Sequence, residues 1–132
     1  AAVIEIRATA QDVLRRARVT LPIELEQLVD ELDHILQPKA IAFSMRSALS
    51  IRRCREGPDA LQLNSAALLD LVLVQEVLPK VRLMAGDPRD EELLQALKNW
   101  TERPAAGGLV RCCARIEAWY GALHSGRDVL QA

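Results

Sequence analysis

Aromatic side chains are scarce in this chain of 132 residues, because Phe43, Trp100, Trp119 and Tyr120 are all that it contains. Its core must be aliphatic, and 50% hydrophobic residues suffice for one domain of this length. The net charge of −1 gives no excess of either sign. It excludes a whole-chain electrostatic attraction to nucleic acid or to an anionic membrane surface. No apolar run reaches the roughly 20 residues of a spanning helix, and no signal peptide is recognisable.

Cysteines are few and badly spaced for a metal. Cys54 stands alone, Cys112 and Cys113 are adjacent, and neither His34 nor His124 has a ligand-spaced partner. The spacing therefore predicts no metal site. We expect free, buried thiols in a cytoplasmic protein.

Catalytic motifs are also missing. Neither glycine-rich phosphate-binding pattern occurs, and Gly107-Gly108 is too short to cradle a phosphate. No nucleophile, base and orienting group stand at a supporting spacing. Glu91 and Glu92 are consecutive on a predicted helix, so their side chains point about 100° apart. This arrangement favours a role in stabilising the helix dipole over acid–base catalysis. The sequence predicts no catalytic residue in this chain.

Helical periodicity dominates from residue 9 onward and predicts an all-α fold, a compact bundle of five to six helices. We expect N-terminal caps at Thr9 (a capping box with Asp12), Ser44, Ser65 and Asp87, the last followed by proline. The predicted helices cover residues 9–18, 22–36, 44–55, 65–78, 88–102 and 109–124.

The apolar faces of these helices predict the core. We expect near-complete burial of Leu28, Leu32, Leu69, Val72, Val77, Leu94 and Leu97. On the last helix the side chains available for burial are Val110, Cys113, Ile116, Ala118, Tyr120 and Leu123.

The first residues do not fit the helical pattern. Residues 2–6 are typical of a single β-strand, which has no sheet to join in so short a chain. The first methionine is Met45. Both observations suggest a piece of a larger protein, whose sheet this strand would join.

The predicted helix at 44–55 carries the strongest local charge. Arg46 and Arg53 are seven residues apart and share a helix face. A guanidinium group suits a phosphate because its planar fork donates two parallel hydrogen bonds. A solvated basic face and a DNA-binding helix-turn-helix are the alternative interpretations of this helix.

Two segments resemble a known family. Residues 71–81, with Gln75, Leu78-Pro79-Lys80 and a preceding Asp70, are followed by the Glu- and Leu-rich residues 90–97. This order resembles the C-terminal helical lid of McrB-like (MoxR/dynein-related) AAA+ ATPases, and residues 2–6 resemble the last strand of the core that precedes such a lid. The resemblance covers about residues 1–100.

The resemblance implies that residues 1–7 are a residual strand of the AAA+ core, that 8–104 are lid helices, and that 105–132 form a C-terminal helix and tail. It implies a lid that couples nucleotide binding and hydrolysis to subunit motion, in a setting that includes DNA restriction and defence. ATP or GTP with Mg²⁺ would be bound by the full-length parent and not by this chain alone. The implied partners are the AAA+ core and a homo-oligomeric ring, with no membrane and no direct nucleic-acid contact by this segment.

Residues 43–48 resemble the lid position whose arginine senses the γ-phosphate. The resemblance therefore implies that Arg46 contacts nucleotide, with Arg53 as a secondary basic contact. We expect Arg46 to be exposed and unpaired; a structural arginine would instead bind Asp30, Glu31 or Asp33. The chain lacks Walker A, Walker B and arginine-finger motifs, so it cannot hydrolyse nucleotide unaided. The alternative function is a free-standing helical interaction domain without catalytic activity.

Overall fold

Six α-helices form the part of the chain that the computed structural model describes, residues 9–56 and 64–130. They are α1 (Ala10–Arg16), α2 (Ile23–Leu36), α3 (Met45–Glu56), α4 (Ser65–Val72), α5 (Pro88–Thr101) and α6 (Val110–His124). The predicted all-α bundle and its six helices are confirmed. The strand predicted at residues 2–6 lies outside the described residues.

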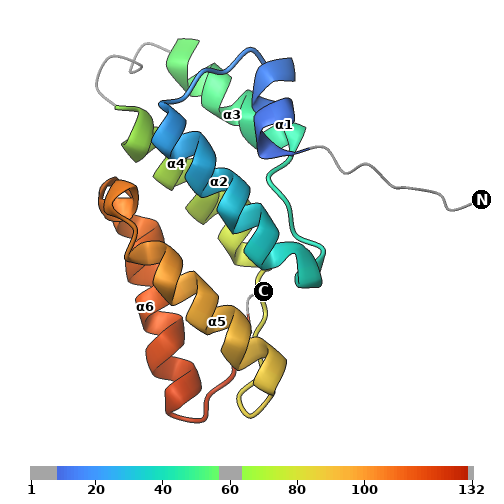
Figure 1. The fold of residues 1–132 in the computed structure, drawn as a ribbon, viewed down its shortest axis with the longest axis vertical. Coiled ribbons are helices and arrows are strands. Elements are labelled where there is room, and N and C mark those ends of the chain that lie inside the picture. The colour runs from blue at the N-terminus through green and yellow to red at the C-terminus, as the bar shows by residue number, and fades with distance from the viewer. Residues whose placement is uncertain (1–8, 57–63, 131–132) are drawn as a thin grey trace, which may run out of the picture.

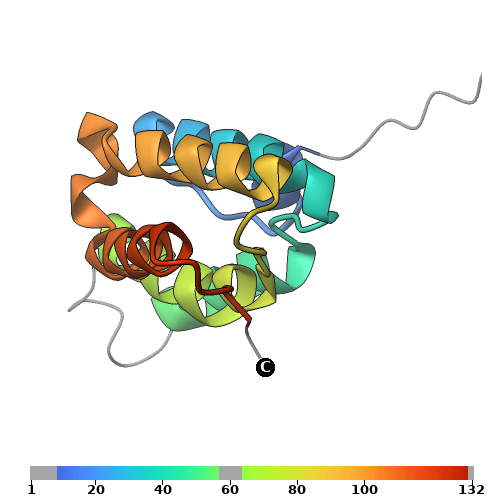
Figure 2. The ribbon, with the colours of Figure 1, turned by 90° about the horizontal axis from the view of Figure 1, so that it is seen from below.

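The helices pack in two layers. Viewed end-on, α2 and α5 form one layer, and α3, α4 and α6 form the other (Figure 2). α5 and α6 are an antiparallel hairpin joined through a 3₁₀ turn at Pro104–Gly108 (Figure 1). The indole N–H of Trp100 on α5 donates to the carbonyl oxygen of Leu28 on α2 at 2.9 Å. This bond ties the hairpin to the longest helix of the N-terminal half.

The core is aliphatic, as the composition predicts. All seven side chains predicted to be buried are at most 3% exposed. The predicted face of α6, however, is wrong in part: α6 buries Cys112, Ile116, Trp119 and Leu123, whereas Val110 is 68% exposed and Ala118 is also exposed. Both faces of this helix carry small or apolar residues, so periodicity alone did not separate them.

Helix ends follow the predicted signals with two corrections. Thr9 and Asp12 form the capping box, and the side chain of Asp87 caps α5. α4 is capped by Asn64, whose side-chain oxygen accepts the N–H of Ala67 at 2.8 Å, and not by Ser65. α1 ends at Arg16 rather than near Arg18, because Arg18 adopts a left-handed φ of 56°.

The predicted helix at 65–78 is not one regular α-helix. After Val72 the chain forms a π-helical segment, Leu73–Val77, and then a 3₁₀ turn, Leu78–Lys80. Pro79 lacks the N–H that would continue the helical ladder, so the regular pattern cannot extend through it. The π segment shifts the register of the side chains that follow Val72, including Glu76.

Candidate functional site

The start of α3 is held firmly against α2. Phe43, 3% exposed, donates its backbone N–H to the carboxylate of Asp33 at 2.7 Å. The hydroxyl oxygen of Ser44 accepts the N–H of Ser47 at 3.3 Å, which caps the helix as the sequence predicts. These contacts fix the first turn, where Arg46 is the second helical residue.

Arg46 projects into solvent from this turn. Its side chain is 88% exposed, as predicted, but its Nε lies 3.9 Å from Oε1 of Glu76. The expectation of an unpaired guanidinium is therefore corrected: a weak ion pair is present, although its distance is too long for a hydrogen bond. On α2, Asp30 accepts the N–H of Gln11, Glu31 binds Arg103 and Asp33 accepts the N–H of Phe43, whereas the ion pair of Arg46 is with Glu76. Arg46 is thus not the structural arginine that the alternative interpretation required.

Glu76 is the residue that sequence reasoning missed. It lies in the π-helical segment and is brought to Arg46 by the packing of α4 and its extension beside α3. Its Oε1 is buried and has no hydrogen-bond partner among the described residues, while the side chain as a whole is 21% exposed. Burying a carboxylate oxygen without a partner is costly, so the arrangement favours a cation at this position. The guanidinium of Arg46 is the cation that the structure provides.

The outer face of α3 consists of Met45, Arg46, Leu49 and Arg53. Arg53 is exposed, and the two apolar side chains are 36% and 38% exposed. The hydroxyl of Ser50 donates to the carbonyl oxygen of Arg46 at 3.0 Å, within the helix. Two guanidinium groups beside two exposed apolar side chains suit contact with another domain that carries an anion.

The other candidate chemistries find no support in residues 9–56 and 64–130. No group of three His, Cys, Asp or Glu side chains is placed to hold a metal ion there. Burial, together with the neighbouring Asp70, raises the pKa of the Cys112 thiol, so it is a poor nucleophile. Burial also raises the pKa of Cys113. Cys54 is exposed, which corrects the expectation that the thiols are buried.

Residues 5–124 match the sequence model of a family described as a domain of unknown function, DUF8727. The chain belongs to the DUF8727 family. No curated protein and no solved structure matches it. The matched range contains all four residues of the outer face of α3 and also Glu76, so the candidate site lies inside the DUF8727 domain. Among the described residues of this domain, no helix has the length and apolar character needed to cross a membrane.

Proposed function

We propose that this DUF8727 chain is the lid subdomain of a AAA+ nucleoside-triphosphatase motor, with Arg46 facing the nucleotide. The observation that carries the proposal is the position of Arg46, in the first turn of α3 and 88% exposed. A phosphate sensor must meet its ligand across a domain boundary, so its guanidinium must be exposed on a rigid element. The resemblance to McrB-like lids supports the same residue.

The outer face of α3 gives the lid a surface for the AAA+ core. Met45 and Leu49 would pack on the core, while Arg46 reaches the γ-phosphate and Arg53 makes a secondary contact. The N-terminal turn adds the partial positive charge of the helix dipole beside Arg46. The core would hold ATP or GTP with Mg²⁺, and this nucleotide would supply the phosphoryl group that is transferred to water. The residues of this chain orient that group and neutralise its charge.

The packing of the bundle suits a lid that moves as one piece. α3 contacts both α1 and α4, and α2 contacts α5. A change at Arg46 would therefore act on a packed block rather than on an isolated helix. In a homo-oligomeric ring, such a block couples the nucleotide state of one subunit to the position of the next. A DNA restriction or defence system is one setting for such a motor.

The test begins with the reading frame from which the chain comes. We expect Walker A and Walker B motifs upstream of residue 1, within the length of one domain. In the full-length protein, Arg46→Ala should lower nucleotide turnover at least about tenfold, the range for a lost charge contact to the transition state. Arg46→Lys should restore part of it, because a point charge replaces a bidentate donor. Arg89→Ala, which removes an exposed arginine on α5, should leave turnover unchanged.

Two results would contradict the proposal. A start codon directly before residue 1, with no ATPase core in the same protein, would favour the free-standing interaction domain. Normal turnover in the Arg46→Ala protein would exclude the sensor role. The 132-residue chain alone should show no hydrolysis that survives repurification.

A further inference from the structure

The sequence contains the pattern Arg-Arg-x-Arg twice, at residues 15–18 and 52–55. These two segments hold six of the 17 basic residues and no acid. They lie 34 or more residues apart along the chain, yet the fold joins them because α1 packs on α3. Arg55 closes the connection: its guanidinium donates to the carbonyl oxygen of Thr20 at 2.6 Å and to the hydroxyl of Ser65 at 2.9 Å. We call these six arginines the arginine surface.

Four of the six guanidinium groups are available at the surface. Arg15, Arg16, Arg18 and Arg53 are exposed. Arg55 is held by the contacts just described, and Arg52 pairs with Glu56 at 3.0 Å. The acids Asp12 and Glu56 lie beside this surface, but they are fewer than its six arginines, so it remains a local concentration of positive charge that a net charge of −1 conceals.

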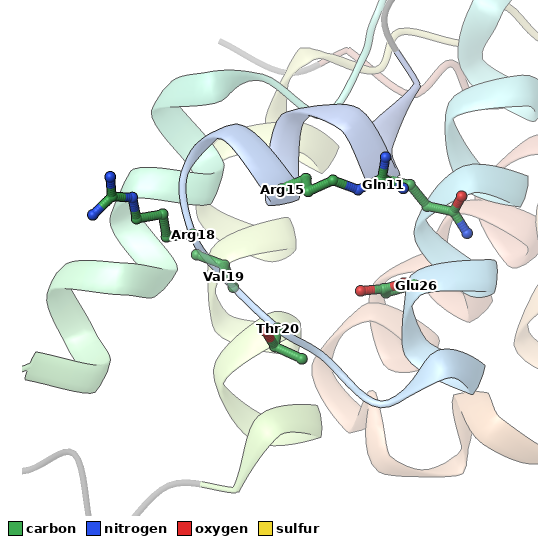
Figure 3. Close-up of a pocket in the computed structure, with 6 residues that line it drawn as sticks. All are labelled: Gln11, Arg15, Arg18, Val19, Thr20 and Glu26. Atoms are coloured by element: carbon green, nitrogen blue, oxygen red, sulfur yellow. The ribbon is translucent and has the colours of Figure 1, made fainter.

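The groove beside α1 is not the centre of this surface. It is lined by Gln11, Arg15, Arg18, Val19, Thr20 and Glu26. Figure 3 shows Arg15 and Glu26 on opposite walls of the groove, whereas the side chain of Arg18 extends away from it. The acid in the groove opposes a small anion there. Arg18 instead directs its charge outward, on the side away from Glu26.

The side chains around the four exposed arginines indicate the class of partner. None of the large hydrophobic side chains exposed on the described surface belongs to either four-residue segment. A folded protein partner normally requires an apolar centre to the interface. Neither segment contains an aromatic residue on which an unpaired base could stack. Leu49 on α3 lies one turn before Arg53 and is 38% exposed, but the two segments themselves offer only guanidinium groups, which suit a row of phosphates.

We propose that the arginine surface binds the phosphate backbone of double-stranded nucleic acid without sequence preference. The net charge excludes only an attraction of the whole chain, and it misses the convergence of the two segments. The proposal departs from the implication of the family resemblance that this segment does not contact nucleic acid directly. The proposal shares Arg53 with the outer face of α3. It does not depend on the lid function, because its other exposed arginines lie on α1 or directly after it and it uses neither Arg46 nor a nucleotide.

The experiment measures binding of the 132-residue chain to a mixed-sequence DNA duplex by fluorescence anisotropy at several salt concentrations. Four phosphate contacts predict a slope of about −3.6 for log affinity against log salt, or about a hundredfold loss between 50 and 200 mM salt. The variant Arg16→Gln, Arg18→Gln, Arg53→Gln should bind at least about tenfold more weakly at 50 mM salt, with a slope near −1. Arg16→Lys, Arg18→Lys, Arg53→Lys should retain the slope, because the charge is kept.

The matched control is Arg89→Gln, Arg111→Gln, Arg115→Gln, which removes the same charge from exposed positions on α5 and α6. It should bind within about twofold of the wild type. An equal loss in both triple variants would overturn the proposal, and so would no measurable duplex binding at 50 mM salt. Polyglutamate that competes as well as DNA of equal charge would overturn it in favour of an acidic protein partner. If the triple glutamine variant fails to fold by circular dichroism, the single variants Arg16→Gln and Arg53→Gln decide, each with an expected slope change of about 0.9.

Discussion

Asp70 and Glu76 lie six residues apart on one continuous helical run, but their surroundings differ completely. The Asp70 carboxylate is buried and accepts the backbone N–H groups of Arg111 at 2.9 Å and Cys112 at 2.8 Å. It thereby caps α6, whose own N-cap residue, Leu109, offers no side-chain acceptor. Glu76 has a buried oxygen with no hydrogen-bond partner in the described structure. The comparison separates a carboxylate that holds the fold from one that is positioned beside an exposed arginine.

Leu69 adjoins Asp70, and the loss of its side chain gives the change in unfolding free energy with which changes at the two acids are compared. It is fully buried, and Leu69→Ala should lower the free energy of unfolding by about 2–5 kcal/mol, because the cavity left behind cannot fully collapse. Urea denaturation of the 132-residue chain measures this change. A loss below about 1 kcal/mol would mean that the side chain is not packed as described.

Asp70→Ala should cost slightly less, about 2–3 kcal/mol, since the buried N–H of Cys112 and the partly buried N–H of Arg111 lose their acceptor and the N-terminus of α6 loses its negative charge. Hydrogen exchange should report the loss first at the amides of Arg111 and Cys112. Asp70→Asn is the matched control and should recover part of the stability, because the amide oxygen still accepts a hydrogen bond. Equal stability of Asp70→Ala and the wild type would show that Asp70 does not stabilise the fold by capping α6.

Asp90, a third acid, tests how a paired carboxylate responds to pH. It receives the Lys39 ammonium at 2.7 Å and the N–H of Met84 at 2.8 Å. Burial raises the pKa of Asp90, but the bonds from Lys39 and Met84 and the Lys39 charge outweigh it, so the pKa is below its usual value. This carboxylate therefore contributes stability above its unfolded pKa of about 3.9, and the contribution is lost as the pH falls through the lower folded value. Thermal unfolding between pH 6 and pH 2.5 should show a smaller acid-induced fall in Asp90→Asn than in the wild type.

Glu76→Gln should have the smallest effect on stability, within about 1 kcal/mol, because its pair with Arg46 spans 3.9 Å and the Arg46 side chain is 88% exposed. A loss of unfolding free energy comparable to that of Asp70→Ala would show that Glu76 stabilises the fold as Asp70 does, and would contradict the difference between the two acids. In the full-length protein of the proposed function, the same change should alter turnover through Arg46 and should have no further effect in the Arg46→Ala background.

Local signals account for most of the fold that could be predicted. The apolar repeat through Leu28 and Leu32 and the caps at Thr9 and Asp87 all act within a few residues, so they can be read from sequence. The exposure of Arg46 was predicted too, but from the sensor role that the family resemblance implies and not from a local signal. The missed contacts are long-range: Asp70 meets α6 across 41 residues, and Glu76 meets Arg46 only after the π-helical segment shifts its register. The meeting of the two Arg-Arg-x-Arg segments likewise requires α1 and α3 to pack together.

A final consequence follows from the β-bridge between Leu83 and Val129, which the helical periodicity could not reveal. Two backbone hydrogen bonds, at 2.9 and 2.8 Å, join these residues, and the Asp128 carboxylate accepts the N–H of Ala85 at 2.8 Å. The α5–α6 hairpin is thus clamped at its open end as well as at its turn. Because the bridge is antiparallel, the chain before Leu83 and the chain after Val129 leave it on the same side. A pull that separates these two ends therefore loads the two backbone hydrogen bonds of the bridge before it reaches α6. The α5–α6 hairpin is therefore closed at both ends, and the chain enters and leaves it at the same point.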